Sequence, residues 1–298
     1  FAMIAESDKR ISMTLSRTAT LRIQCDDKKG LVYRISKFIF ERGGNIVDSQ
    51  QHTEELGNRF FMRVVFDCAG VEAGQDQLRA DLDRLAGEID VQADLAFSDA
   101  RKRIAIMVSK YDHCLYDLLL RHRYGELEAD IPLVLSNHPD LEPVVRGFGI
   151  PFHPIPVDKT DKQQAEAAAL DLFLRHRIDL IVLARYMQIL GPTLLSAFPM
   201  RIINVHHGFL PAFKGARPYH QAYERGVKLI GATSHYATEE LDMGPIIDQE
   251  TIRVDHTRGA EDMVAMGRDI EKLVLAKAVK AHVADKIMVY RNRTIVFH

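Results

Sequence analysis

One segment of the chain, Asn204-Val205-His206-His207-Gly208-Phe209-Leu210-Pro211, carries side chains that can take part in catalysis. They are Asn204, His206 and His207. The apolar residues just before them predict a buried strand that ends here. Because Asn204 and His206 are two positions apart, they point to the same face of an extended segment. An amide can donate to a developing oxyanion, and an imidazole can donate, accept or shuttle a proton. The alternative is a buried Asn and His that only satisfy loop backbone groups.

A carboxylate, Asp242, lies in a second segment, Glu239-Glu240-Leu241-Asp242-Met243-Gly244-Pro245, just before the apolar start of another predicted strand. A carboxylate working through water can relay protons to and from a reacting group. An Asp with an ordinary pKa is a poor proton donor at neutral pH, so we expect burial or a neighbouring His to tune Asp242. The alternative for this residue alone is a turn or helix-cap acid.

A metal site is the second interpretation of these side chains. His206, His207 and Asp242, joined by His235, are suitable ligand types, but no HExxH-like helical spacing supports them. We therefore expect neither a metal nor a cofactor. The three cysteines also lack metal-type spacing, which predicts reduced thiols in a cytoplasmic protein; they are Cys25, Cys68 and Cys114.

Length and charge limit the class of protein. A chain of 298 residues predicts two domains. The formal net charge of −2 argues against a dedicated partner of nucleic acid or of a membrane surface. No apolar run approaches the roughly 20 residues that a membrane span needs, and we find no secretory signal. Residues 1–12 show no periodicity, and Met13 could be the natural start.

The elements that must carry these side chains begin with a small amino-terminal domain, for which we predict residues 13–98. Residues 19–25 alternate like a strand, and the next apolar residues fall on one face of a helix that ends at Gly43-Gly44. A hairpin, a second helix and a last strand follow, at residues 45–51, 59–67, 75–85 and 89–96. This order of elements is the ferredoxin-like α+β arrangement.

Two stretches of this domain, residues 25–32 (Cys25-Asp26-Asp27-Lys28-Lys29-Gly30-Leu31-Val32) and 43–46 (Gly43-Gly44-Asn45-Ile46), resemble an ACT domain. The resemblance implies a small amino-acid effector, glycine or methionine, and pairing of the chain with copies of itself. Its candidate effector-binding residues are Asp27, Gly30, Leu31 and Asn45. The alternative is a dimerisation module without a ligand.

A polar linker at residues 98–102 leads into the second domain, for which we predict residues 99–298. Apolar strands are predicted at residues 103–108, 132–135, 180–183, 202–205 and 230–233. Helical patterns separate most of them, at residues 113–122, 139–147, 162–176 and 218–225. A long helix at 261–284 and a closing hairpin at 287–297 complete the chain. Alternating helices and unbroken apolar strands predict a Rossmann-like, mostly parallel, helix-covered sheet and an α/β fold.

Three motifs of the second domain resemble the formyltransferase family that uses 10-formyltetrahydrofolate: Asn204-x-His206, Leu210-Pro211-x-Phe213-x-Gly215 and Leu241-Asp242-x-Gly244-Pro245-Ile246. The resemblance covers about residues 103–297. It implies that Asn204, His206 and Asp242 are the catalytic set. It also implies that the segment after residue 183 lines a pterin pocket, where apolar side chains flank a flat heterocycle; the alternative is ordinary core. The candidate substrate-binding residues are Tyr186, Met187, Gln188, Ile189, Leu190, His207 and Gly244.

The chain departs from the glycinamide ribonucleotide enzyme of that family after the first strand of the domain. A glycine-rich turn there holds the substrate phosphate, because small residues let backbone N–H groups converge on an anion. This chain has Ser109-Lys110-Tyr111-Asp112-His113-Cys114, with no glycine and with Asp112 to repel a phosphate. A second departure is Gly208, where a residue with a side chain is expected.

Without an amine acceptor, water becomes the attacking group. We therefore expect hydrolysis of 10-formyltetrahydrofolate to formate and tetrahydrofolate, with folate as substrate rather than cofactor. The resemblance implies a role in balancing one-carbon pools and in supplying formate for purine biosynthesis. Two alternatives remain, a formyltransferase acting on an amine acceptor and a non-enzymatic sensor of folate or amino acids.

Overall fold

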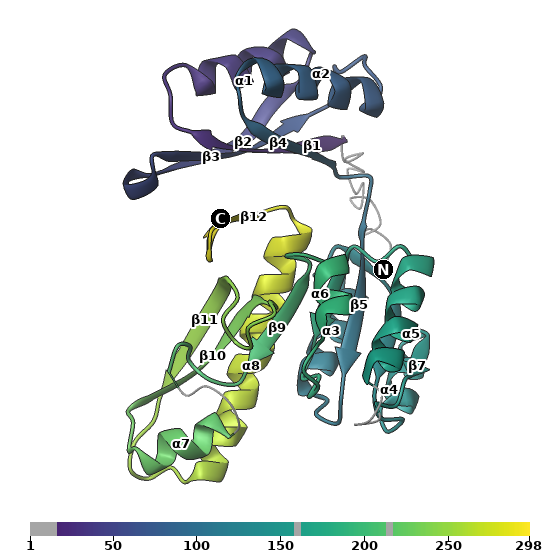
Figure 1. Ribbon diagram of the computed structural model, residues 1–298, viewed down its shortest axis with the longest axis vertical. Helices are drawn as coiled ribbons and strands as arrows, with labels where there is room; N and C mark the ends of the chain where they lie inside the picture. Colours follow the sequence, from purple (N-terminus) through teal and green to yellow (C-terminus); the bar gives the residue numbers. More distant parts are fainter. Residues whose placement is uncertain (1–16, 158–161, 213–216) are drawn as a thin grey trace, which may run out of the picture. The chain divides into compact units, whose positions relative to one another are not determined.

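The computed structural model describes residues 17–157, 162–212 and 217–298 and divides into two compact units (Figure 1). The division falls between Ala100 and Arg101, two residues beyond the boundary expected from the linker. The expected start at Met13 lies outside the described residues. Within the described part of the chain, no helix is long and apolar enough to span a membrane.

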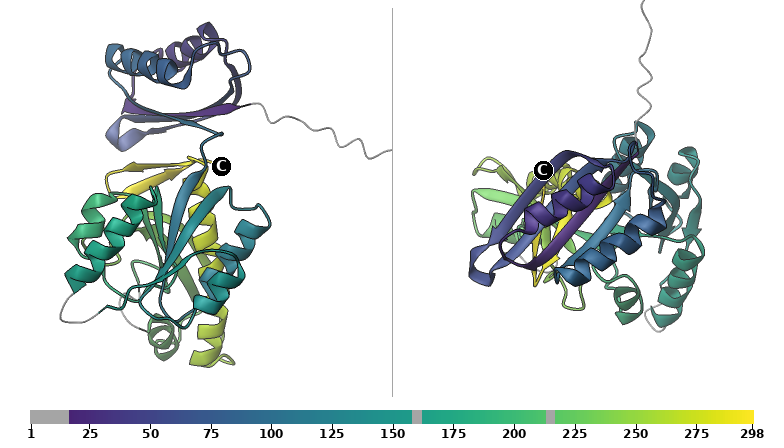
Figure 2. Two further views of the ribbon diagram at one scale, coloured as in Figure 1. Left: turned by 90° about the vertical axis from the view of Figure 1, so that its right-hand side faces the viewer. Right: turned by 90° about the horizontal axis from the view of Figure 1, so that it is seen from above.

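The amino-terminal unit has the predicted ferredoxin-like fold. Its two helices cover one face of an antiparallel sheet with the strand order β2-β3-β1-β4 (Figure 2). The apolar periodicity of the first helix explains its packing, since Leu31, Ile35, Phe38 and Ile39 are all buried. The elements are β1 (Thr18–Asp26), α1 (Leu31–Glu41), β2 (Asn45–Glu54), η1 (Glu55–Gly57), β3 (Arg59–Asp67), α2 (Gln75–Glu88) and β4 (Gln92–Phe97).

The predicted effector residues lie around the start of α1 and the start of β2. Asp27, Gly30 and Asn45 are exposed. Leu31 packs in the core of the unit, so its side chain cannot face a ligand at the surface. Gly30 has a φ of 89°, a left-handed conformation that suits glycine.

The carboxy-terminal unit is built on a seven-stranded sheet with the order β11-β10-β9-β8-β5-β6-β7. Strands β5 to β9 pair in parallel, whereas β10 is antiparallel to both β9 and β11. The prediction of a mostly parallel sheet is therefore confirmed. The strands are β5 (Lys102–Val108), β6 (Ala129–Ser136), β7 (Phe152–Pro154), β8 (Leu180–Leu183), β9 (Ile202–His206), β10 (Leu229–Tyr236) and β11 (Ile246–Arg253).

Helices cover both faces of this sheet. One core cluster packs α3, α4, α7 and the long α8 on one face, and a second packs α5 and α6 on the other. The helices are α3 (His113–Arg123), α4 (Glu142–Gly147), α5 (Lys162–Arg175), α6 (Pro192–Ala197), α7 (Pro218–Glu224) and α8 (Ala260–Val283). A hairpin of β12 (Ile287–Tyr290) and β13 (Arg293–Val296) closes the chain.

The sequence prediction missed three short elements, η1, strand β7 and helix α6. Strand β7 has three residues and helix α6 has six, and such short segments carry too few repeats to show a period. Strand β10 also continues to Tyr236, beyond the predicted end at residue 233, because its last residues pair with β9.

The sheet has a switch point between β5 and β8. The chain leaves β5 for α3 on one face and leaves β8 for α6 on the other, so the two loops diverge. Ligands of open α/β sheets bind in the crevice outside the carboxyl ends of the strands at such a point. The ends of β5, β8 and β9 are therefore where substrate is expected.

Candidate active site

The three predicted catalytic residues come together at the ends of β9 and β10. His206 Nδ1 lies 3.1 Å from Asp242 Oδ2. Asn204 reaches the same carboxylate through His235, because Asn204 Nδ2 is 3.1 Å from His235 Nε2 and that nitrogen is 3.7 Å from Asp242 Oδ1. Residues from a parallel strand, an antiparallel strand and a turn thus meet at one carboxylate.

His235 is a member of this cluster that the sequence suggested only as a possible metal ligand. It is 2% exposed, and its Nδ1 lies 2.9 Å from the carbonyl oxygen of Tyr236. Since a carbonyl only accepts, Nδ1 donates. Nε2 lies between the Asn204 amide and the Asp242 carboxylate, so His235 contacts both residues. The sequence has no direct signal for this, because the pairing of Asn204 with His235 follows from strand register.

Burial of Asp242 tends to raise its pKa, but hydrogen bonds from His206 and His235 outweigh burial and hold the pKa well below its ordinary value. The side chain is only 8% exposed. Asp242 is thus a stable carboxylate anion between two imidazoles. This direction is opposite to the tuning expected for a proton donor at neutral pH, because the favourable pairing stabilises the charged form.

The turn that carries Asp242 is shaped by a close backbone approach. Asp242 has a φ of 58°, in the left-handed region that an Asp tolerates better than most residues. At Gly244 a Cβ would overlap the carbonyl oxygen of Tyr236, so only glycine fits there. The backbone N–H of Tyr236 also donates to the carbonyl of Pro245, at 3.0 Å. The turn is therefore held against the end of β10. This packing explains why a glycine stands at Gly244, which the sequence predicted to contact substrate.

The loop that follows the two histidines is anchored by Thr233 of β10. Its hydroxyl donates to the carbonyl of Gly208, at 2.9 Å, and accepts from the backbone N–H of Leu210, at 3.1 Å. Gln249 donates to the same hydroxyl and to the carbonyl of Leu210. Gly208 is thus part of an ordered loop. Phe213 and Gly215 of the predicted motif lie outside the described residues.

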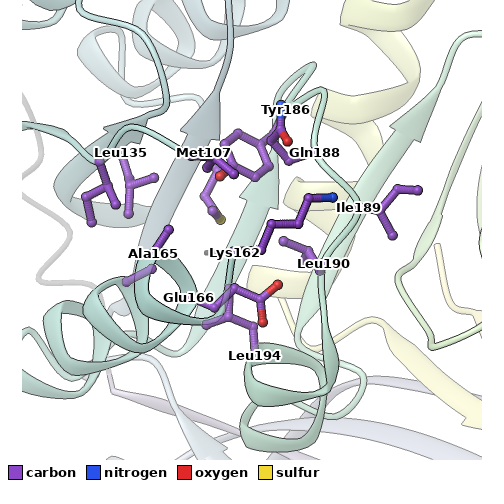
Figure 3. A pocket seen from close by; sticks show the side chains of 13 residues that line it. Met107, Leu135, Lys162, Ala165, Glu166, Tyr186, Gln188, Ile189, Leu190 and Leu194 are labelled. Atoms are coloured by element: carbon purple, nitrogen blue, oxygen red, sulfur yellow. The ribbon is translucent and has the colours of Figure 1, made fainter. Parts of the chain in front are cut away.

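A pocket on the α5–α6 side of the sheet is lined by Tyr186, Gln188, Ile189 and Leu190, four of the predicted substrate-binding residues (Figure 3). They face apolar residues of β5, β6 and α6 and the side chains of α5, which are Met107, Leu135, Leu194, Lys162, Ala165 and Glu166. Burial, and secondarily Glu166, raises the pKa of Tyr186 to about 12, so its hydroxyl stays protonated.

The other predicted substrate-binding residues do not line this pocket. Met187 is 51% exposed, and its backbone N–H donates to the hydroxyl of Ser109, at 2.9 Å. His207 and Gly244 lie next to the cluster around Asp242 instead. None of the three catalytic candidates lines the pocket, so the cluster and the pocket are separate features.

The loop after β5 is tied down by side chains rather than open to an anion. Ser109 donates to Asn137 Oδ1, at 2.6 Å, while accepting from Met187. The guanidinium of Arg185 lies over the ring of Tyr111, with 5.1 Å to the centroid. The backbone N–H of Ser109 donates to the carbonyl of Arg185, at 3.3 Å, and Lys110 to Asp112 are exposed.

A buried charged cluster, absent from the sequence predictions, lies behind this loop. Glu271 of α8 is 2% exposed and lies 2.8 Å from His113 Nε2, 3.0 Å from the Tyr219 hydroxyl and 3.4 Å from Arg185 Nε. Burial tends to raise the pKa of Glu271, but the bond from His113 and the charge of Arg185 outweigh it and lower the pKa. The sequence does contain a signal for this cluster, because Glu271 lies on the apolar face of a long predicted helix. A carboxylate buried there requires partners.

Among the described residues, ligand atoms are spaced for a metal ion at His113, Cys114 and Glu271, not at the set suggested by the sequence. The carboxylate there is already engaged by His113, Tyr219 and Arg185. Burial, and then the charge of Glu271, raises the pKa of the Cys114 thiol well above its usual value. A protonated thiol and a paired carboxylate beside a guanidinium are poor cation ligands.

Comparison with known proteins gives family matches for both units. A family described as "Formyl transferase" matches residues 102–279, and a family described as "ACT domain" matches residues 19–83. A relative from Synechocystis sp. named formyltetrahydrofolate deformylase is 48% identical over 280 residues, covering 94% of this chain and 98% of its own. The protein of the same name from Bacillus subtilis is 48% identical over 279 residues, covering 93% of each chain.

Solved structures show the same pattern. A formyltetrahydrofolate deformylase from Pseudomonas syringae superposes with a TM-score of 0.94 at 44% identity, covering 96% of both chains. A glycinamide ribonucleotide transformylase from Symbiobacterium toebii superposes with a TM-score of 0.63 at 28% identity, covering 66% of this chain and 95% of its own. The transformylase likeness is thus confined to part of the chain.

Proposed function

The chain belongs to the formyl transferase family, and we propose that it hydrolyses 10-formyltetrahydrofolate to formate and tetrahydrofolate. The relatives that align with nearly the whole chain carry the name formyltetrahydrofolate deformylase. The observation that carries hydrolysis rather than transfer is the loop after β5. The hydroxyl of Ser109 in this loop is bonded to the side chain of Asn137 and to the backbone of Met187. The loop also lacks the glycines that would let backbone N–H groups bind an acceptor phosphate.

The chemistry requires a tetrahedral adduct with a negative oxygen, and two groups are suited to stabilise it. The Asn204 amide contacts His235 and can donate to that oxygen. His206 can donate from its imidazole, with Asp242 holding its Nδ1. One positioned donor of this kind contributes about 3–4 kcal/mol to stabilisation of the transition state.

Asp242 acts as a permanent anion in this proposal. With its pKa held low, the carboxylate stabilises positive charge on His206 or His235 as protons move. Proton transfer between the attacking water and N10 of the folate can then pass through a neighbouring imidazole and bound water. The pterin is expected beside Tyr186 to Leu190, where four residues already line a pocket.

The amino-terminal unit supports a regulatory or assembly role. Its ACT family match favours a small amino-acid effector, glycine or methionine, at the exposed turn of Asp27 and Gly30. We also propose a homo-oligomer, a cytoplasmic location and a role in supplying formate for purine biosynthesis. The three free cysteines are buried as thiols, which supports a reducing compartment.

The reaction is tested by incubating the protein with 10-formyltetrahydrofolate alone and measuring formate. We expect formate release without any amine, and no acceleration by glycinamide ribonucleotide. Since the proposal uses no metal, exhaustive chelation is expected to leave the rate unchanged. A product that depends on an added amine, with little formate in its absence, would show a transferase instead.

A further inference from the structure

The imidazole of His207 is half-buried between two other rings. Its centroid lies 5.4 Å from that of His206 and 6.3 Å from that of Tyr219. Within the described ranges no hydrogen bond engages either of its nitrogens. A ring nitrogen without a protein partner can form a hydrogen bond with a polar molecule such as water, and this ring lies beside the imidazole of His206.

The neighbouring basic groups have other partners or other roles in the proposed reaction. Asp242 is paired with two imidazoles, one at each of its carboxylate oxygens. His206 directs Nδ1 to Asp242 and, in the proposed reaction, uses its other nitrogen as a donor to the adduct oxygen. His235 is held between Asn204 and the carbonyl of Tyr236. Hydrolysis nevertheless needs an acceptor for the proton that the attacking water loses.

The wall behind His207 is rigid. The Tyr219 ring meets His207 edge-on, and its hydroxyl donates to Glu271, at 3.0 Å. At Gly267 of α8 a Cβ would overlap the Tyr219 ring, so glycine lets this ring lie against the helix. His113 and Arg185 hold the same carboxylate. The cluster thus limits where the His207 ring can turn.

We propose that His207 is the general base that takes a proton from the water attacking the formyl carbon, an inference that rests on the proposed hydrolysis. As the water oxygen bonds to the formyl carbon, its proton passes to the open nitrogen of His207. The adduct then collapses, the bond from carbon to N10 breaks, and N10 takes the proton held by His207. The remaining hydroxyl proton leaves to solvent, so the products are formate, tetrahydrofolate and one proton.

The charges that face His207 keep it ready to accept. Burial, and then the charge of Arg185, lowers its pKa to about 4, with His206 acting in the same direction and Glu271 and Asp242 opposing it. The imidazole is therefore unprotonated at neutral pH. A pKa this low also makes the resting imidazole a weak base, and negative charge that develops on the adduct raises its proton affinity as the reaction proceeds.

The test is chemical rescue of His207→Ala by imidazole, measured as formate release. We expect turnover to fall by about 10²–10⁴-fold, the usual range for a positioned acid–base group, with folate affinity kept. Added imidazole should restore turnover in proportion to its concentration. His207→Gln, which preserves a polar side chain without a basic nitrogen, should stay slow, and folate affinity reports that it is folded.

Two matched variants serve as controls. Asn204→Ala lacks a hydrogen-bond donor rather than a base, so imidazole should not rescue it. His256→Ala removes an exposed histidine and should retain wild-type turnover. Full formate release by His207→Ala, or a slow variant that imidazole fails to rescue, would overturn the role of His207. Absence of formate release by the wild-type protein would instead overturn the proposed hydrolysis.

Discussion

At the scale of single residues, the site depends on one carboxylate that stays charged. Asp242 is mostly buried, yet two imidazoles within 3.1 Å and 3.7 Å outweigh the effect of burial on its pKa. In the proposed reaction it therefore orients and stabilises His206 and His235 rather than donating a proton. The first proton of the attacking water then passes to another group, which in our proposal is His207.

Replacing Asp242 by Asn keeps the shape of the side chain and removes its charge. We expect turnover to fall by about 10²–10⁴-fold, because an imidazolium formed in the reaction loses its partner. Folate affinity should change little, since the pocket-lining residues lie in the segment from Tyr186 to Leu190. Formate release and folate binding by Asp242→Asn check this result. Near-normal turnover would return Asp242 to a role as a turn residue.

The low pKa of His207 has a consequence for stability that is independent of catalysis. An unfolded His has a pKa of about 6.5, whereas the folded pKa is lowered to about 4. Between about pH 6.5 and pH 4 the unfolded chain binds more protons than the folded chain. The free energy of unfolding therefore decreases as the pH falls through this window. His207→Gln lacks this contribution. Denaturant unfolding at pH 7 and pH 5 should show the variant gaining stability relative to wild type at the lower pH.

At the scale of elements, the turn between β10 and β11 positions Asp242 through its fit to the end of β10. Gly244 allows the turn to approach the carbonyl of Tyr236, and the backbone bond from Tyr236 to Pro245 fixes the contact. Asp242 is two residues away, at a φ of 58°. A small shift of this turn would therefore separate the carboxylate from both imidazoles.

Gly244→Ala tests that coupling. The added Cβ overlaps backbone that cannot rotate away, so we expect a loss of about 1–3 kcal/mol in the free energy of unfolding. Turnover should fall as well, because Asp242 moves. Gly147→Ala is the matched control, since the space around Gly147 at the end of α4 is open. Equal behaviour of the two variants in unfolding and formate assays would contradict the argument.

At the scale of the whole molecule, the chain joins a family-typical catalytic unit to a unit with an ACT family match. The exposed turn of Asp27 and Gly30 belongs to the second of these. An effector bound there matters for catalysis only if its binding free energy depends on the state of the folate site. Such coupling is reciprocal, so each ligand changes the affinity of the other by the same factor.

We expect glycine or methionine to bind the intact protein and to change its folate affinity. Titrating each ligand in the absence and presence of the other measures the coupling in both directions. Asp27→Ala should weaken effector binding while leaving basal turnover unchanged, because this side chain is exposed in the other unit. Absence of amino-acid binding, together with a stable oligomer, would leave the unit as an assembly module.

Much of the architecture could be predicted from local pattern. Apolar alternation and helical periodicity are properties of neighbouring residues, so the ferredoxin-like order and the mostly parallel sheet follow from them. The motif around Asn204 and His206 also lies within one strand end, where spacing alone gives a common face. Elements as short as β7 and α6 are beyond this reasoning, because they do not complete a repeat.

Contacts between distant segments were decided only by the tertiary structure. His235 joins Asn204 and Asp242 because the antiparallel register of β9 and β10 places it there. Glu271 meets His113 across 158 positions of sequence, since α3 and α8 pack on the same face of the sheet. The pKa values of Asp242 and His207 depend on such partners and on burial. Local sequence identifies an ionisable side chain, but its charge state belongs to the surroundings that the fold assembles.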